Sequence, residues 1–297
     1  MRQLYGMDIR SLNVFIEVVR QGGFTAASRR LFLTQPSISR IIKQIEEEVG
    51  QRLILRDRRQ IALTDAGKVV YDHAVTLVAA SNRLTAQISD LAGLRRGDVV
   101  LGLPPLAGTL FVPLVKQYVE QYPAIELRMF EKGSKATETA LLGGELELGV
   151  LMLPVDAERF NFVPIAKDHL VLAVPVDSKW AKRRTIRLAE LKNEPLILFP
   201  EDFALNDSIL AACGSQGFAP KVGGRSGQLQ FIIGLIEAGL GNALLPTTVL
   251  RGMKRVASVK VVEPVINWNI GLAWPRSVYL SHAARALLAV AKSHPLT

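Results

Sequence analysis

The sequence predicts an α/β protein whose N-terminal third is helical and whose remainder alternates strands with helices. Three patterns predict this fold class. Apolar residues recur at helical spacing in three short blocks before residue 50, a seam with alternating spacings of four and three residues covers 66–91, and apolar strand patterns alternate with amphipathic helices from residue 98 onward. We therefore expect a small helical domain at 1–65, a linker helix and hinge at 66–97, and an α/β domain at 98–297.

The first 50 residues predict three helices in a helix-turn-helix arrangement. A first amphipathic helix ends at Gly22-Gly23, where glycine adopts the left-handed conformation without strain. Thr25 is the expected N-cap of a short second helix, and a turn follows at 32–33. Thr34 is the expected N-cap of a third helix, with Pro36 in its first turn, where the missing N–H leaves no helical bond unmade.

The predicted third helix has one apolar face and one face of hydrogen-bonding side chains. The apolar face comprises Ile38, Ile41, Ile42, Ile45 and Val49. The side chains near or on the other side are Gln35, Ser37, Ser39, Arg40 and Lys43. Arginine and glutamine make bidentate hydrogen bonds to guanine and adenine edges, whereas lysine more often meets a phosphate. This face, together with Thr34 and Pro36 at its start, therefore predicts contacts to DNA, and the solvated face of an ordinary amphipathic helix is the alternative.

A basic hairpin is expected directly after the third helix. Apolar strands at 53–55 and 61–63 flank a basic tip, Arg56-Asp57-Arg58-Arg59-Gln60. Such a tip is typical of a wing, which lays Arg56 or Arg59 against a minor groove or the backbone, and a solvated basic turn is the alternative. The charge favours a polyanionic partner, because 36 Lys and Arg face 27 Asp and Glu, and +6 of the net +9 falls in 1–97.

A long helix is expected from Ala66 to Leu91, because the segment has no proline and only one glycine near its start. Its apolar or small seam consists of Val70, Ala74, Leu77, Ser81, Leu84, Ile88 and Leu91. A heptad seam of this length predicts pairing with a second helix, and packing on its own domain is the alternative. The glycines and arginines of 92–97 are typical of a hinge.

Four segments of the N-terminal third resemble the winged helix-turn-helix of LysR-type transcriptional regulators. They are Phe24-Thr25-Ala26-Ala27-Ser28, Leu33-Thr34-Gln35-Pro36-Ser37-Ile38-Ser39-Arg40, Ile45-Glu46 and Leu63-Thr64-Asp65-Ala66-Gly67. The family is similar in length and architecture, so the resemblance covers essentially the whole chain. It implies DNA contacts at the positions of Gln35, Pro36, Ser39, Arg40, Arg56 and Arg59.

The same resemblance implies the partners of the protein. It implies that a homodimer or homotetramer, joined through the linker helix, binds an inverted repeat in double-stranded promoter DNA. It also implies a small-molecule effector, and RNA polymerase as a further partner. We expect the function to be sequence-specific transcription regulation that the effector modulates.

The C-terminal two thirds predict two α/β lobes. Strand, loop and helix repeat in the order of a doubly wound sheet, with a helix expected over 134–142. We expect lobe I at 98–163 and 267–297, and lobe II at 164–266. Two α/β lobes with two crossings resemble periplasmic binding proteins, the fold of the LysR-type effector domain. Sheets of this kind bind ligands at the carboxyl ends of their strands.

The family resemblance places the effector between the lobes. The residues expected to line this site are Pro104, Leu106, Gly133, Ser134, Glu201, Phe203, Ser226 and Gln228. In the alternative, the glycines and prolines serve turns and Phe203 belongs to the core. Segments 102–105 and 279–286 are closest to the CidR-like branch, which is associated with small carboxylates. Because Ser134 and Ser226 stand at expected helix N-termini, which attract anions, we expect a small organic acid.

Catalytic, metal and membrane functions find no support in the sequence patterns. The four histidines have no metal-ligand spacing, Cys213 has no histidine beside it, and the phosphate-binding and nucleophile-elbow motifs are absent. We expect no enzyme activity, no metal and no cofactor, with a hydrolase or transferase on the two-lobed domain as the alternative. The most apolar stretch, 225–251, predicts a buried helix and strand rather than a membrane span. One cysteine and the lack of a signal-peptide core predict a cytoplasmic protein.

Overall fold

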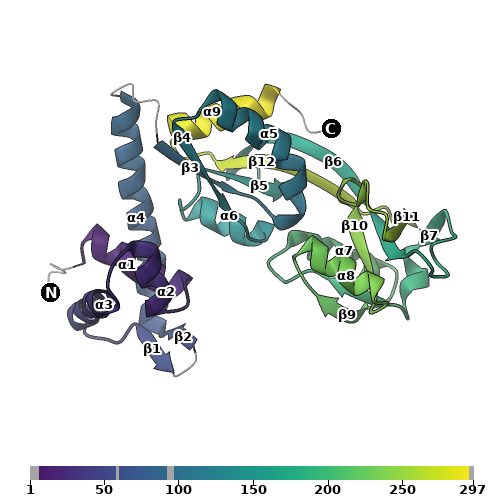
Figure 1. The fold of residues 1–297 in the computed structure, drawn as a ribbon, viewed down its shortest axis with the longest axis horizontal. Helices are drawn as coiled ribbons and strands as arrows, with labels where there is room; N and C mark the ends of the chain where they lie inside the picture. The colour runs from purple at the N-terminus through teal and green to yellow at the C-terminus, as the bar shows by residue number, and fades with distance from the viewer. Residues whose placement is uncertain (1–6, 58–59, 92–96, 294–297) are drawn as a thin grey trace. The chain divides into compact units, whose positions relative to one another are not determined.

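The computed structural model describes residues 7–57, 60–91 and 97–293. The chain divides into two compact units, with the boundary in the sequence at residues 93–94 (Figure 1). The first unit is mainly helical, and the second is an α/β unit of two lobes. The predicted α/β class with a helical N-terminal third is therefore confirmed.

The N-terminal unit contains four helices and a two-stranded hairpin among its described residues. The elements are α1 (Ile9–Arg20), α2 (Phe24–Leu31), α3 (Gln35–Val49), β1 (Ile54–Asp57), β2 (Gln60–Leu63) and α4 (Asp65–Leu91). The apolar stripe of α3 packs into the centre, where Ile38, Ile42 and Ile45 are fully buried against Phe15 of α1. The amphipathic pattern thus positions α3 with its polar side outward.

The caps of the helices agree with the sequence at α3 and differ at α2. Thr34 caps α3 as predicted, since its Oγ1 accepts a hydrogen bond from the N–H of Ser37 at 3.3 Å. The prediction that Thr25 caps α2 is wrong, because the N-cap is Gly23 and Thr25 lies inside the helix. The left-handed turn at Gly22 lets α2 begin at Phe24, whose ring then packs on the core.

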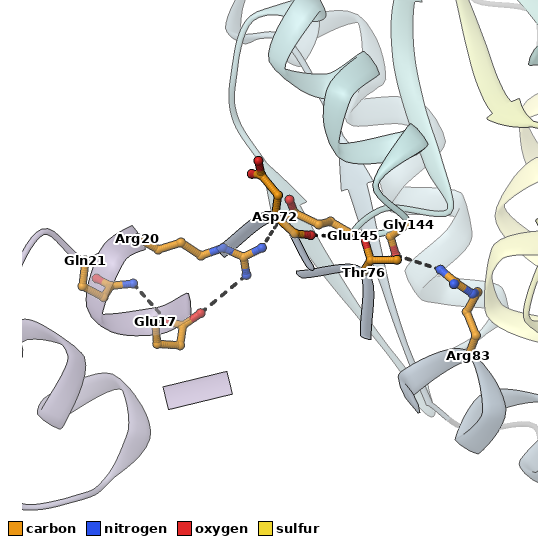
Figure 2. Close-up of polar contacts among 8 residues, drawn as sticks. All are labelled: Glu17, Arg20, Gln21, Asp72, Thr76, Arg83, Gly144 and Glu145. Atoms are coloured by element: carbon orange, nitrogen blue, oxygen red, sulfur yellow. Dashed lines mark hydrogen bonds and ion pairs between the residues drawn. The ribbon is translucent and has the colours of Figure 1, made fainter. Parts of the chain in front are cut away.

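The first half of α4 packs against α1. Ala74 and Val75 of α4 are buried against Leu12 and Ile16 of α1. Polar contacts bind neighbouring turns within each helix (Figure 2): Glu17 accepts from Gln21 at 3.4 Å in α1, and Thr76 donates to the carbonyl of Asp72 at 3.2 Å in α4. The N-terminal half of the expected helix-pairing seam is therefore partly used inside the unit.

The second unit is built on one continuous mixed sheet that passes through both lobes. Its strand order is β4-β3-β5-β12-β6-β10-β8-β9, with β11 and β7 attached through β6. Lobe I contains β3 (Gly97–Gly102), α5 (Gly108–Gln121), β4 (Ile125–Phe130), α6 (Ser134–Leu142), β5 (Leu148–Met152), β12 (Asn267–Pro275) and α9 (His282–Ser293). Lobe II contains β7 (Thr185–Arg187), β8 (Pro195–Leu198), α7 (Ala204–Ser215), β9 (Lys221–Arg225), α8 (Leu229–Glu237), β10 (Asn242–Pro246) and β11 (Val256–Glu263).

Strand β6 (Phe160–Pro175) joins the two lobes. It pairs antiparallel with β12 up to His169, and with β10 from Leu170 onward. The lobe boundary expected at residue 164 lies within this strand. Because β6 pairs with strands of both lobes, its backbone connects the lobes. The connection lies close to the carboxyl ends of the parallel strands β3, β5, β8 and β10.

Helices cover both faces of the lobe I sheet (Figure 1), as in a doubly wound domain. One face packs against α5 and α9, where the buried hydroxyl of Tyr118 donates to the carbonyl of Ala283 at 2.9 Å. The other face packs against α6. There, a Cβ atom added to Gly102 or Gly149 would lie 2.5 or 2.6 Å from Cγ2 of the fully buried Thr137. These two glycines therefore let α6 sit close to the sheet, and they set the position of its N-terminus.

Segment 225–251 folds as predicted, into α8 and the fully buried strand β10. Among the residues that the structure describes, no helix is long and apolar enough to cross a membrane.

Candidate functional site

The residues around α3 that were predicted to contact DNA lie at the surface of the helix and its N-cap. Thr34, Gln35, Pro36, Ser37, Arg40 and Lys43 are exposed, and Ser39 is half-buried. They surround the N-terminal half of α3, because the buried stripe forces these positions outward. The structure thus gathers all seven residues on α3 and its N-cap, at the positive end of the helix dipole.

Local contacts distinguish the members of this surface. The hydroxyls of Thr34 and Ser37 lie 2.8 Å apart, which orients both for the cap. Lys43 forms an exposed ion pair with Glu47 at 3.3 Å, one turn further along α3. Within the described part of the chain, no ion pair or hydrogen bond holds the side chains of Gln35 and Arg40. These two side chains are therefore the most available for contacts to base edges.

Phe32, in the turn predicted at 32–33, stands out at the surface of the N-terminal unit. Its side chain is 95% exposed, and its backbone is left-handed with φ of 54°. It ends α2 and stands two residues before the cap of α3. Residues other than glycine, asparagine and aspartate are strained in this conformation.

The hairpin after α3 has the geometry expected for a wing. Ile54 pairs with Leu63, and Arg56 with Ile61, in an antiparallel ladder. The predicted contact residue Arg56 therefore lies in β1, while Arg59 lies outside the described residues. Glu46 connects the hairpin to α3, because its Oε1 accepts from the N–H groups of Leu53 at 2.9 Å and Ile54 at 3.2 Å.

The segment Leu63-Thr64-Asp65-Ala66-Gly67 joins the hairpin to α4. The hydroxyl of Thr64 donates to the carbonyl of Arg52 at 2.7 Å and accepts from the N–H of Gly67 at 2.9 Å. A Cβ atom on Gly67 would lie 2.0 Å from the carbonyl oxygen of Leu53. This segment therefore fixes the wing against the start of α4 through short contacts that require glycine.

Three apolar side chains of the α4 seam are exposed. Leu77, Leu84 and Ile88 are 52%, 59% and 58% exposed. They are spaced seven and four residues apart, which places them on one side of the helix. Within the N-terminal unit the described residues leave this stripe uncovered, in contrast to Ala74. A row of this kind is the surface that a second helix covers in a coiled coil.

A small cavity lies between the lobes of the second unit, at the carboxyl ends of the strands. Its volume is about 20 Å³, roughly the space of one water molecule. The lining residues are Pro104, Leu106, Ala107, Ser134, Val150, Leu151, Met152, Phe203, Leu205, Trp268 and Ile270. Lobe I supplies most of them, lobe II supplies Phe203 and Leu205, and the lining is mostly apolar.

The structure places the predicted effector residues in two groups. Pro104, Leu106, Ser134 and Phe203 line the cavity. Gly133, Glu201, Ser226 and Gln228 do not line it. The Ser226 hydroxyl accepts from the N–H of Gln228 at 3.0 Å in the turn before α8, and Glu201 is exposed. Sequence reasoning missed Met152, Trp268 and Ile270, because it placed the lining on loops rather than at strand ends.

Four contacts close the lobes over this cavity. The Asp202 carboxylate accepts from the N–H of Gly133 at 3.0 Å, and the Asp202 carbonyl accepts from the N–H of Lys135 at 3.0 Å. The Ser134 hydroxyl accepts from the N–H of Ala204 at 3.1 Å. Lys135 and Asp207 form an exposed ion pair at 2.6 Å. The first turn of α6 is thereby joined to the first turn of α7.

Phe203 projects from lobe II between these contacts. Its ring stacks on Phe199, with the centroids 5.6 Å apart. Gly227 leaves room for it, because a Cβ atom there would lie 2.6 Å from the Phe203 ring. Phe203 is therefore a fixed apolar wall of the cavity.

Asp168 lies on β6 where that strand passes between the lobes. Its carboxylate accepts from the N–H and the hydroxyl of Thr248, both at 2.8 Å, and from the N–H of His169 at 2.7 Å. Burial raises the pKa of Asp168, but these hydrogen bonds outweigh burial, so the pKa lies below its ordinary value. The network ties the crossing strand to lobe II.

Residues suited to catalysis do not gather at the cavity. Cys213 is fully buried in α7, and burial raises the pKa of its thiol to about 11, which keeps it protonated and unreactive. Among the described residues, no group of three His, Cys, Asp or Glu side chains could hold a metal ion.

Known proteins resemble this chain over almost its entire length. The family model "Bacterial regulatory helix-turn-helix protein, lysR family" matches residues 9–68, and the model "LysR substrate binding domain" matches residues 92–295. The HTH-type transcriptional regulator YwbI of Bacillus subtilis (strain 168) is 38% identical over 291 residues, which cover 97% of each chain. The transcriptional dual regulator GltC of the same organism is 30% identical over 282 residues, which cover 94% of each chain. The crystal structure of full-length CbnR complexed with its target DNA has a similar fold, with a TM-score of 0.66 at 21% identity over 97% of this chain and 99% of that chain.

Proposed function

Because this chain belongs to the LysR family of DNA-binding transcriptional regulators with an effector-binding domain, we propose that it reads an inverted repeat with α3 and responds to a small organic acid bound between the lobes. The single observation that carries the DNA half is the exposed polar surface of α3, with Gln35 and Arg40 free of internal contacts among the described residues. Its relatives are transcriptional regulators, and we propose that the chain has no catalytic activity.

Dimerisation through α4 is the second part of the proposal. The exposed row of Leu77, Leu84 and Ile88 supports it, since a second α4 would remove these side chains from water. A two-fold axis would bring two copies of α3 to neighbouring major grooves of a palindrome. We propose a homodimer that assembles further to a tetramer on promoter DNA, contacts RNA polymerase there, and works in the cytoplasm.

The cavity supports a small amphiphilic effector. Phe203 and Trp268 offer apolar walls, and the Ser134 hydroxyl stands at the N-terminus of α6, where an anion is electrostatically favoured. A small organic acid combines an apolar body with one carboxylate and matches both features. Binding would alter how the subunits are arranged on DNA only to the extent that the acid prefers one arrangement, typically by a few kcal/mol.

The test of this function is binding of the full-length protein to the DNA directly upstream of its own gene. Binding is measured at two salt concentrations against scrambled DNA, with and without a panel of small organic acids. We expect specific binding that one acid alters, and a fall in affinity with salt that reflects phosphate contacts. Binding no tighter than to scrambled DNA would contradict the DNA half. An unaltered complex, together with no heat in calorimetric titration of the acids, would contradict the effector half.

A further inference from the structure

The contacts between α6 and α7 point to a role for Asp202, a residue that the functional assignment does not use. We propose that Asp202 is an internal anion that holds the effector cleft closed in the absence of ligand. The proposal rests on the proposed function insofar as an effector must enter between the lobes, because closure of that cleft then sets how readily the protein responds.

Asp202 makes two contacts to the start of α6 with two different groups. Its Oδ2 accepts from the N–H of Gly133, and its backbone carbonyl accepts from the N–H of Lys135, each at 3.0 Å. Lys135 carries one of the first N–H groups of α6, which have no acceptor inside the helix. A carboxylate at this place also meets the positive end of the α6 dipole. Lobe II thus supplies the charge that a bound acid would otherwise supply.

Gly133 provides independent evidence that the fit is specific. A Cβ atom at this position would lie 2.3 Å from the carbonyl oxygen of Asp202 and 2.6 Å from its Oδ2. The φ angle of Gly133 is outside the left-handed region, so backbone conformation does not demand glycine there. The reason for glycine is therefore the approach of Asp202 from the other lobe.

The cavity is too small for an effector while the lobes are closed. At about 20 Å³ it admits roughly one water molecule, so an acid of even a few carbon atoms enters only when the lobes separate. Separation breaks the Asp202 contacts together with the hydrogen bond from Ala204 to the Ser134 hydroxyl at 3.1 Å. Effector binding must offset that loss, so Asp202 acts as a positioning residue that raises the effector concentration required for a response.

Hydrogen exchange of the full-length protein, without DNA or ligand, tests the closure directly. The amides of Gly133, Lys135 and Ala204 are donated across the lobes, so their exchange reports separation. We expect Asp202→Ala to accelerate the exchange of Lys135 and Ala204, whose own acceptors the substitution leaves in place, by about tenfold or more, because a bond to a charged acceptor across the lobes is lost. Gly133→Ala should accelerate exchange of Lys135 and Ala204 similarly, since its methyl group separates the lobes.

The matched control is Asp207→Asn. It removes the ion pair with Lys135, whose members are 44% and 58% exposed, and should change exchange by less than about twofold. Exchange within α9, on the far side of lobe I, should be the same in all variants and shows that they are folded. If Asp202→Ala fails to fold, Asp202→Asn replaces it, with a smaller acceleration expected in the same amides.

Wild-type exchange rates of Lys135 and Ala204 in both Asp202 variants would overturn the proposal, as would equal acceleration of these two amides in Asp202→Ala and Asp207→Asn. Neither result depends on DNA or effector binding. Failure of the proposed function would instead appear as absent specific DNA binding by the wild-type protein, with the closure of the cleft unaffected.

Discussion

Arg40 and Phe32 are single residues of the N-terminal unit whose side chains are exposed and contribute little to stability. Arg40 is exposed on α3 without an internal partner among the described residues, so folding gains little from its charge. Phe32 has an exposed ring, which gains almost no free energy from burial, and a left-handed backbone, which costs free energy. These two residues therefore add little to the stability of the unit, and the backbone of Phe32 lowers it.

Substituting Arg40 tests base reading. Arg40→Ala should lose about 1 to 3 kcal/mol of binding free energy at the preferred sequence and relax the preference at one base pair, if Arg40 contacts a base edge. The measurement is competition binding with operator variants changed one position at a time. Arg10→Ala, an exposed arginine on α1, serves as the control. An equal loss on all sequences would assign Arg40 to a phosphate instead.

Substituting Phe32 tests the cost of the left-handed turn. Phe32→Asn should raise the free energy of unfolding by about 1 kcal/mol, because asparagine adopts this conformation with less strain and no packing is lost. Urea denaturation of the two proteins measures the difference. A decrease in stability would mean that the Phe32 ring is covered in the assembled protein.

At the scale of elements, close approaches between backbones fix how helices meet strands. Gly67 lets the first turn of α4 lie against the carbonyl of Leu53, and Gly102 and Gly149 let α6 sit on the lobe I sheet around Thr137. Asp168 connects the crossing strand β6 to Thr248 in lobe II. A few short contacts therefore fix the position of α6 on the sheet and the position of β6 where it passes between the lobes.

Gly67→Ala should destabilise the N-terminal unit by about 1 to 3 kcal/mol, since the added Cβ atom forces α4 away from the hairpin. The control is Gly214→Ala in α7, where no atom lies within 4 Å of an added Cβ atom and stability should rise slightly. Thermal unfolding of both variants measures the contrast. Equal melting temperatures would show that the hairpin yields without cost.

Asp168→Asn should lower the free energy of unfolding by about 1 to 3 kcal/mol at neutral pH, because hydrogen bonds to a buried carboxylate are weakened. The folded-state pKa lies below the unfolded value of about 3.9, so this stability is present above that value and is lost as the pH falls through the folded pKa. Denaturation at several pH values should show the gap to wild type shrinking below pH of about 4. The exposed Asp177→Asn is the control, and a gap independent of pH would contradict the assignment.

At the scale of the whole molecule, the two units carry surfaces for different partners. The first unit exposes the polar face of α3, which we propose contacts DNA, and the apolar row on α4, which we propose pairs with a second copy. The second unit contains the cavity between its lobes. Effector binding in the second unit affects DNA binding by the first unit if the open and closed forms of the cleft prefer different arrangements of the subunits. The three proposed partners therefore correspond to three separate parts of the chain.

Leu84→Glu tests the role of the α4 row in assembly. Removing a buried leucine from a helix pair costs about 1.5 to 3 kcal/mol, so the dissociation constant of the dimer should rise by about tenfold or more. Light scattering coupled to size exclusion measures the oligomer, and affinity for a full inverted repeat should fall more than affinity for a half-site. Asn82→Glu, exposed on α4 but off the row, is the control. An unchanged oligomer in Leu84→Glu would place the dimer contact elsewhere.

Periodicity and caps were sufficient to predict the helices of the first unit and much of lobe I. The bounds of α6 and the cap of α3 by Thr34 follow from local patterns, because each depends on residues within a turn or two. The start of α2 was predicted wrongly, since the preceding glycine turn decided it. In lobe II, α7, β7, β9 and β11 were not predicted. α7 is weakly amphipathic, and β9 is short and interrupted by two glycines.

The candidate sites divide in the same way. The face of α3 could be predicted because burial of one stripe exposes the other within a single helix. The cavity could be predicted only in part. Predicted loop residues such as Pro104 line it, but strand residues such as Trp268 were missed, because only the sheet topology brings them together. The contact of Asp202 with Gly133 spans 69 residues of chain. No local pattern encodes such a contact, since it arises from the packing of two lobes, whereas helices, caps and surface chemistry arise from neighbours in the sequence.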